Sequence, residues 1–354
     1  MLLIYLDEVY PTFFLHRETA AGRIYYFDQL TVPYAVTSDI TEYLSSPIEN
    51  KIAVLYNREL PLSRDHEFLT TYFEQIKAAS RLVFLIELEL YGARIFETYI
   101  GNNVYAVVPG FNNTHYNNVI FKSAWFDMVI DLYKKFPDIL DSIDYTTPKK
   151  FYFDALLGTS RHNRAVVYSS IIDNNLEDKI FVNNDLGKFI LEPGTVIPSW
   201  SRKEHTSNYV TYKDHWCHLS CIIPTIIYNQ SAYSIITETI ASQTDCFYTE
   251  KTIKPILGRR LFVAFASYKF LENLRRLGFK TFDAVIDESY DQIEENIPRW
   301  EAAFEQVKYL CSIDQKIILE KIQPIVEHNY QLAMSEEFAN MPIKSILSKV
   351  VDII

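Results

Sequence analysis

The stretch KKFYFDALLGTSRHNRAVVYSSIID (residues 149–173) decides the fold, because an apolar run ends at a glycine and a helical pattern follows at once. The apolar run predicts a buried strand, and the rest predicts a helix with Ser160 as a plausible N-cap. A strand, a glycine turn and a helix N-terminus in succession are typical of an α/β domain that binds an anion. Arg161 and Arg164 can share one helix face, where guanidinium groups match phosphate oxygens. A solvated basic helix start is the other interpretation.

Segments of strand and helix character alternate on both sides of this stretch, which predicts parallel sheets. The expected strands are 1–7, 51–57, 81–90, 103–111, 179–183, parts of 221–239, and 259–267. The segment 81–90 could instead be a helix segment. The expected helices are 65–81, 123–136, the start of 249–260, and most of 290–334. A further helix is expected within 269–279, ended by Gly278. The polar segment 141–150 is the candidate linker between two successive α/β units.

Composition excludes several classes of protein. The 354 residues include 9 glycines, with neither a G-x-G-x-x-G fingerprint nor a Walker A loop, so phosphate binding would need cationic side chains and helix N-termini. The net charge of −11 argues against a generic nucleic-acid coat, yet residues 151–280 hold 15 Lys and Arg against 12 Asp and Glu. Four cysteines, no secretion signal and no long apolar run predict a soluble protein of a reducing compartment.

A second segment of interest is YTEKTIKP (residues 248–255). Thr249 is suited to cap a helix whose first turn carries Glu250, and a carboxylate there is stabilised by the helix dipole. Lys251 occupies the same turn, where a cation is disfavoured unless an anion lies close by. An anion site and a capped surface helix are the two interpretations.

Two further patterns contain residue types that can bind metals, but we interpret both as structural or solvated segments. The residue types of HWCHLSC (215–221) suit zinc, but the spacing is C-x-x-x-C and no second ligand pair follows. We therefore expect packing at this segment. Asp287 and Asp291 are four residues apart in an acidic region, and we expect both to be solvated.

Carboxylates near the ends of the N-terminal strands are candidates for a general base. They are Asp7, Glu8, Glu87 and Glu89, with His16 as an outsider. Most residues of this kind are simply solvated, and the pattern favours no single one of them.

Several of these segments together resemble a known family. They are Phe153–Gly158 with Arg161 to Arg164, then 236–239, 248–255, 277–283 and 286–290. In this order they resemble the nucleotide-sugar half of GT-B glycosyltransferases, most nearly the α-1,3-fucosyltransferase-like enzymes of phages and bacteria. The resemblance covers about residues 150–310, and the N-terminal half is similar in outline only.

This resemblance implies an α/β protein of the GT-B type, with two Rossmann-like domains facing a cleft and C-terminal helices. We place the acceptor domain at residues 1–148 and the donor domain at 149–325. Residues 326–354 would be C-terminal helices that pack back.

By the same resemblance, six residues bind the donor: Arg161, Arg164, Glu238, Glu250, Lys251 and Lys254. Glu250 would hold the ribose hydroxyls, and Glu238 would line the cleft. Lys251 and one of the two arginines would hold the diphosphate. Fixed cations stabilise the charge that develops on a departing diphosphate, so no metal and no cofactor beyond the UDP- or GDP-sugar is expected. Among the base candidates, Asp7, Glu8 and Glu87 are kept without a choice, and the stereochemical outcome stays open.

The implied activity is metal-independent transfer of a hexose or pentose to a hydroxyl group. The leading acceptor is a hydroxymethylated pyrimidine, such as hydroxymethylcytosine, in phage duplex DNA, with the base flipped into the cleft. The pairs Lys149-Lys150, Arg202-Lys203 and Arg259-Arg260 favour DNA, and the net charge opposes it. The alternatives are a glycan or protein acceptor, or a non-catalytic protein that binds nucleotide sugars. We expect a cytoplasmic protein, in the host cell if phage-encoded, without a membrane partner.

Overall fold

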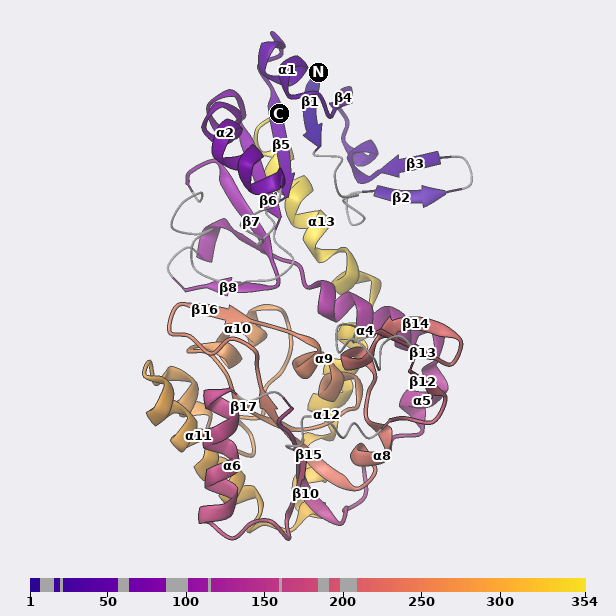
Figure 1. Ribbon diagram of the computed structural model, residues 1–354, viewed down its shortest axis with the longest axis vertical. Helices are drawn as coiled ribbons and strands as arrows, with labels where there is room; N and C mark the ends of the chain where they lie inside the picture. Colours follow the sequence, from indigo (N-terminus) through magenta and orange to yellow (C-terminus); the bar gives the residue numbers. More distant parts are fainter. Residues whose placement is uncertain are drawn as a thin grey trace. The chain divides into compact units, whose positions relative to one another are not determined.

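The structure is a computed structural model that describes residues 1–6, 16–19, 22–56, 64–86, 101–113, 116–158, 161–183, 191–197 and 209–354. The chain forms two compact units (Figure 1). The first comprises residues 1–122 and 339–354, and the second comprises residues 123–338. Each unit contains a parallel sheet, which confirms the α/β class predicted from the sequence.

The sheet of the first unit has the strand order β4-β1-β5-β6-β7-β9, and all of its pairings are parallel. Its strands are β1 (Leu2–Leu6), β4 (Tyr34–Thr37), β5 (Lys51–Tyr56), β6 (Leu82–Ile86), β7 (Val104–Val108) and β9 (Val119–Phe121). The other elements are β2 (His16–Thr19), β3 (Gly22–Tyr25), η1 (Tyr26–Gln29), α1 (Ile40–Ser45), α2 (Arg64–Ala79), β8 (Gly110–Asn112) and η2 (Tyr116–Asn118). The four strands expected at 1–7, 51–57, 81–90 and 103–111 are therefore present over their described parts, and residues 7, 57 and 87–90 lie outside the described residues.

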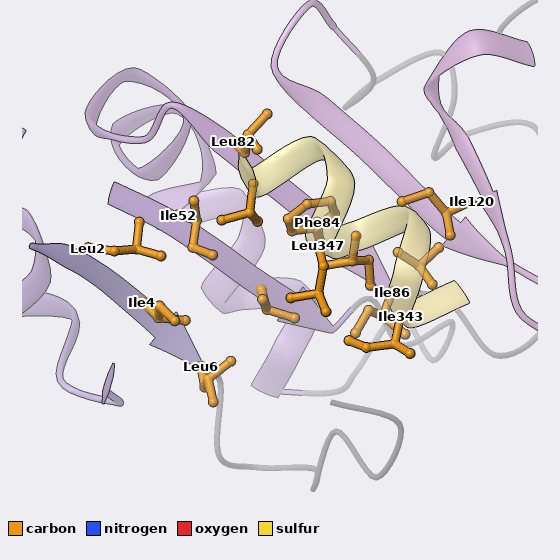
Figure 2. Close-up of a cluster of buried hydrophobic side chains, with 14 residues drawn as sticks. Leu2, Ile4, Leu6, Ile52, Leu82, Phe84, Ile86, Ile120, Ile343 and Leu347 are labelled. Atoms are coloured by element: carbon orange, nitrogen blue, oxygen red, sulfur yellow. The ribbon is translucent and has the colours of Figure 1, made fainter. Parts of the chain in front are cut away.

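The C-terminal helix α13 (Glu336–Val351) supplies part of the core of this unit (Figure 2). Ile343, Ile346 and Leu347 pack among buried strand residues such as Ile52 and Phe84. At about 25 cal/mol for each Å² of apolar surface removed from water, such burial is the main term that stabilises the contact. From Ala339 onward the last helix thus belongs to the first unit, although its sequence follows the second.

The sheet of the second unit has the order β11-β10-β15-β17 and is also parallel throughout. Its strands are β10 (Phe151–Leu156), β11 (Ile180–Asn183), β15 (Ser231–Thr237) and β17 (Phe262–Phe265). The helices are α4 (Ala124–Lys135), α5 (Pro137–Asp141), α6 (His162–Asp173), α8 (Thr225–Tyr228), α9 (Glu250–Leu257), α10 (Phe270–Arg276), α11 (Asn296–Leu310) and α12 (Gln315–Met334). The short elements are η3 (Leu219–Cys221), β16 (Asp245–Phe247) and η4 (Glu288–Gln292).

Local signals in the sequence set the ends of several helices. Ser123 accepts a hydrogen bond from the Phe126 amide and caps α4, and Gly278 follows α10 with a φ of +91°. Glycine adopts that left-handed conformation without the strain a side chain would add. The predicted glycine stop after this helix is confirmed.

A small antiparallel sheet, β12-β13-β14, also belongs to the second unit. Its strands are β12 (Thr195–Val196), β13 (Tyr209–Tyr212) and β14 (His215–His218). Lys213 and Asp214 form the two-residue turn between the last two strands, and both have positive φ, as hairpin turns of this length require.

The structure differs from the sequence-based expectations at two places. The candidate linker 141–150 lies inside the second unit, because α4 packs on α9 and the units divide at residue 122. Asp291 was expected to be solvated, but it is 1% exposed and accepts hydrogen bonds from the amides of Leu271 and Glu272. Its carboxylate stabilises the positive N-terminal turn of α10. Among the described residues, no helix is long and apolar enough to cross a bilayer.

Candidate functional site

A cavity of about 400 Å³ opens in the second unit at the carboxyl ends of β10 and β15. In open parallel sheets, ligands characteristically bind at this edge, where the loops after the strands diverge. Five of the six residues predicted to bind a donor line it: Arg161, Arg164, Glu250, Lys251 and Lys254. Residues far apart in the sequence are thus brought to one cavity.

The turn after β10 carries the two arginines to the cavity. Gly158 has a φ of +40°, and a Cβ at this position would lie 3.7 Å from Nη1 of Arg164. Arg164 is 7% exposed, whereas Arg161, the N-cap residue of α6, is exposed and donates to the Thr239 carbonyl at 3.1 Å. Burial, and then the charge of Arg161, lower the pKa of Arg164. Ser160, the predicted N-cap, lies outside the described residues.

Asn163 fixes the start of α6 against the sheet, a role that the sequence analysis missed. Its side-chain amide donates to the carbonyls of Glu238 and Phe265, at 3.0 and 2.9 Å. Because those carbonyls follow β15 and end β17, one side chain ties the helix start to both strands. The sequence offers one signal for a role of Asn163, because this residue lies within RHNR (161–164), between the two arginines predicted to bind the donor.

The second helix at the cavity is α9, and its N-terminus has the predicted cap. The Thr249 hydroxyl accepts a hydrogen bond from the Lys251 amide. Glu238 supports this cap: its carboxylate accepts from the Thr249 amide at 3.0 Å, the Thr249 hydroxyl at 2.7 Å and the Thr252 hydroxyl at 2.6 Å. Glu238 is fully buried, so its carboxylate holds α9 in place and does not line the cavity.

The charged residues of α9 form a compact group on the wall of the cavity. Lys251 Nζ lies 2.7 Å from Oε1 of Glu250 and 3.3 Å from the Thr239 hydroxyl. Lys254 Nζ donates to the Ser220 carbonyl at 2.8 Å. Burial alone would raise the pKa of Glu250, but the charges of Lys251 and Lys254 outweigh it and hold this pKa below its usual value. Burial, and also Lys251, lower the pKa of Lys254, although Glu250 acts in the opposite direction.

A buried ion pair lies at the wall of the cavity, which Asp154 lines, and it was not predicted. Arg260 Nη2 is 2.6 Å from Asp154 Oδ2, and the two side chains are 2% and 3% exposed. The arginine also donates to the carbonyls of Tyr228, Ser231 and Tyr233. Every part of the guanidinium therefore has partners, which a buried charge requires. Arg260 thus joins β10, α8 and β15 next to the cavity.

The charge of the cavity lining is positive. Asp154 is neutralised by Arg260, and Glu192 accepts hydrogen bonds from the Thr225 hydroxyl and the Ile226 amide. Four cations, Arg161, Arg164, Lys251 and Lys254, thus face the two carboxylates Glu192 and Glu250. Burial lowers the pKa of Arg164 and of Lys254, and the charge of a neighbouring cation, Arg161 and Lys251 respectively, lowers it further, as expected for like charges held close together. A ligand with about two negative charges would relieve that repulsion.

The remaining sequence-based candidates are the proposed bases and the segment 215–221. The base candidates Asp7, Glu8, Glu87 and Glu89 lie outside the described residues, and His16 lies in β2. At 215–221, His218 lines the cavity, and its Nδ1 pairs with the Ser220 hydroxyl at 2.6 Å. Within the described ranges, no cluster of three or more His, Cys, Asp or Glu residues could hold a metal ion.

Comparison with known proteins gives one structural likeness. No protein-family model matches the chain, and no curated protein matches it in sequence. A solved structure described as an alpha1,3-fucosyltransferase with GDP is similar at 11% sequence identity. The alignment covers 98% of this chain and 89% of that one, with a TM-score of 0.41. Similarity at this level does not establish a shared activity.

The lowered pKa of Glu250 predicts a pH-dependent contribution to stability. Because the carboxylate is favoured in the folded state, its contribution is complete above the unfolded pKa of about 4.3 and is lost as the pH falls through the folded value. We expect the stability difference between wild type and Glu250→Gln to shrink between pH 6 and pH 3. Urea unfolding midpoints at each pH measure it. A difference independent of pH would show that the ion pair with Lys251 does not stabilise the fold.

Proposed function

We propose that the protein is a glycosyltransferase that uses a nucleoside-diphosphate sugar and binds this donor in the cavity of the second unit. The observation that carries the proposal is the set of four cations lining one cavity at the carboxyl ends of a parallel sheet, three of them at the N-termini of α6 and α9. Helix N-termini attract anions, and guanidinium and ammonium groups supply charge-assisted hydrogen bonds. A diphosphate has the size and charge that this arrangement favours.

The remaining wall of the cavity suits the nucleoside. Leu219, Ile222, Pro224 and Ile236 supply an apolar surface for the base. Glu250 is the carboxylate nearest the lysines of α9 and would accept hydrogen bonds from the ribose hydroxyls. A cavity of about 400 Å³ is within the usual range for small-molecule sites.

The proposed reaction breaks the bond between the sugar C1 and the diphosphate oxygen and forms a bond between C1 and an acceptor hydroxyl oxygen. The diphosphate leaves with the bonding electron pair, and the hydroxyl proton passes to a base. Lys251, Arg161 and Arg164 would stabilise the developing charge in place, without reorganisation. The proposed bases, Asp7, Glu8 and Glu87, remain candidates of equal standing.

The acceptor in this proposal is a hydroxyl of either modified DNA or a glycan. Two of the basic pairs that favoured DNA are less available than the sequence suggested. Arg260 is buried, Arg259 lies 3.6 Å from the centre of the Tyr330 ring, and Lys149 pairs with Asp144 at 2.7 Å. Arg202 and Lys203 lie outside the described residues. The structural support for a DNA acceptor is correspondingly smaller.

The test of the proposed function is hydrolysis of a panel of UDP- and GDP-sugars, read by release of nucleoside diphosphate. Release from at least one donor is expected, together with tighter binding of that nucleoside diphosphate than of the monophosphate. Binding without release, and without transfer to any acceptor, would favour the non-catalytic protein that binds nucleotide sugars. Transfer to hydroxymethylcytosine-containing DNA, detected by the added mass of a hexose or pentose, would select the DNA acceptor.

Activity is expected to survive treatment with EDTA. Arg161, Arg164 and Lys251 lie where they can neutralise the leaving diphosphate, the task that a divalent cation performs in other transferases. Diphosphate release before and after chelation measures this, with re-addition of Mg²⁺ or Mn²⁺ as the control. Loss of release that either metal restores would contradict the metal-independent mechanism.

A further inference from the structure

The two residues that follow β15, Glu238 and Thr239, contact both helix starts at the cavity. The Glu238 carbonyl accepts a hydrogen bond from the Asn163 side chain at 3.0 Å, and the Thr239 carbonyl accepts one from Arg161 Nη1 at 3.1 Å. The Thr239 hydroxyl accepts from Lys251 Nζ at 3.3 Å. One short segment thus contacts a cation from the start of α6 and another from the start of α9.

The Glu238 carboxylate is fully buried, and a carboxylate can only accept hydrogen bonds. Its Oε1 accepts from the Thr249 amide at 3.0 Å and from the Thr252 hydroxyl at 2.6 Å. Its Oε2 accepts from the Thr249 hydroxyl at 2.7 Å and from the Thr239 amide at 3.2 Å. Such bonds compensate a buried charge for the loss of water. They also fix which way the Thr249 hydroxyl points.

The direction of the Thr249 hydroxyl matters for Lys251. The hydroxyl has one proton, and it donates this proton to Glu238. Its oxygen is therefore left to accept, and two groups of Lys251 approach it, the backbone amide at 3.3 Å and the ammonium at 3.3 Å. If the proton pointed toward the ammonium instead, the two groups would repel each other. Glu238 thus makes the Thr249 oxygen an attractive partner for the ammonium.

The ammonium of Lys251 is held at the cavity wall by three acceptors. They are Glu250 Oε1 at 2.7 Å and the hydroxyls of Thr239 and Thr249, both at 3.3 Å. The two hydroxyl contacts are longer than the usual limit of about 3.2 Å, so they orient the ammonium while leaving its protons available to a ligand oxygen. A lysine side chain is otherwise flexible. A cation that is already in place costs less to use when an anion binds.

We propose that Glu238 and Thr249 are positioning residues for the donor diphosphate: Glu238 fixes the direction of the Thr249 hydroxyl, and this hydroxyl holds the Lys251 ammonium at the cavity wall. The inference rests on the proposed function, because it assigns the diphosphate to Lys251. Glu238 is 0% exposed and Thr249 is 2% exposed, so both act through Lys251 and not by touching the donor.

The test compares Thr249→Val, which keeps the shape of the side chain without the hydroxyl, with Thr249→Ser, which keeps the hydroxyl. Calorimetric titration of the full chain with UDP, GDP and inorganic diphosphate measures the affinities. We expect Thr249→Val to weaken binding of these ligands about fivefold, the effect of one hydrogen bond, and Thr249→Ser to bind as wild type does. Affinity for UMP and GMP should fall less, because the misplaced cation serves the diphosphate.

A double-mutant cycle separates positioning of Lys251 from a general loosening of α9. If Thr249 acts through Lys251, Thr249→Val weakens binding in the wild-type background and has no further effect in the Lys251→Ala background. If Thr249 only stabilises the helix, the two losses add. Glu238→Gln offers one acceptor oxygen in place of two and should follow the same pattern. The two Thr249 variants decide the question even if Glu238→Gln does not fold.

Asp314→Ala is the matched control. Asp314 caps α12 by accepting from the Lys316 amide two residues on, as Thr249 caps α9 by accepting from the Lys251 amide. Its loss should leave all affinities unchanged.

Two results would overturn the positioning role: wild-type affinity in Thr249→Val, or losses that add in the cycle. The proposed function has a separate outcome. Wild type that binds inorganic diphosphate with the expected sensitivity to Thr249→Val, but binds neither UDP nor GDP, would contradict the nucleotide-sugar donor and support the positioning role. Absence of binding of all three ligands to wild type would contradict both.

Discussion

Replacing Arg260 with leucine is expected to lower the free energy of unfolding by about 3–5 kcal/mol. The change removes the partner of Asp154 and leaves a carboxylate buried without a counter-charge. It also leaves the carbonyls of Tyr228, Ser231 and Tyr233 without their donor. Burial already raises the pKa of Asp154 in the intact pair, and Arg260 opposes that rise. Urea unfolding of the purified variant measures the loss.

Two controls separate the buried pair from a general effect of losing an arginine. Arg276→Leu removes an arginine from a helix surface, where it pairs with Glu272 at 2.7 Å, and should cost less than about 1 kcal/mol. Adding Asp154→Asn to Arg260→Leu should recover part of the stability, because the isolated charge is then gone. A loss of less than about 1 kcal/mol for Arg260→Leu itself would show that the pair does not hold the sheet together.

The contrast between Arg260 and Thr249 shows what the sequence could and could not predict. The Thr249 cap depends on residues next to it in the chain, and the structure has the cap where the pattern predicts it. The pairing of Arg260 with Asp154 joins residues 106 apart, and nothing near either one signals a buried partner. From the sequence, Arg260 looked like part of a basic surface.

The same distinction between local and long-range contacts explains which site residues, and which unit boundary, could be predicted from the sequence. Arg161, Arg164 and Lys251 could be predicted to share a cavity because each stands at a helix start, and such starts meet at one edge of a parallel sheet. Glu238 could not be assigned correctly, since its carboxylate is used by the α9 cap, a contact across 11 residues. The division at residue 122 depends on the packing of α4 against α9, which no local pattern records.

Replacing Lys251 with alanine is expected to weaken binding of UDP or GDP by about 10- to 150-fold, the equivalent of a charge-assisted hydrogen bond of about 1.5–3 kcal/mol. The ammonium lies in the first turn of α9, where it gains nothing from the helix dipole. Glu250 already pairs with this ammonium at 2.7 Å, and a bound diphosphate would give it a second anionic partner. Loss of the Glu250 pair should lower thermal stability, and relief of the unfavourable dipole should offset part of that loss, so the variant is expected to fold. Calorimetric titration with each nucleotide measures the affinity.

Lys308→Ala is the matched control, because Lys308 pairs with Glu305 at 2.8 Å on the surface of α11, as Lys251 pairs with Glu250 at 2.7 Å. It should leave nucleotide affinity unchanged. Inorganic diphosphate should compete with the nucleotide in wild type and compete less well in Lys251→Ala, since the lost contact is to the diphosphate.

Kinetics can distinguish a contact to the intact donor from a contact to the leaving group. If the bond from Lys251 to the diphosphate strengthens as the sugar departs, Lys251→Ala lowers kcat as well as raising KM for the donor. Glu250→Ala would remove contacts to the ribose, which does not react. It should therefore weaken binding of the sugar nucleotide and of the free nucleoside diphosphate equally, and leave kcat near its wild-type value. Wild-type affinity and turnover in Lys251→Ala, with the fold intact, would mean that this segment is a capped helix and that the diphosphate binds elsewhere.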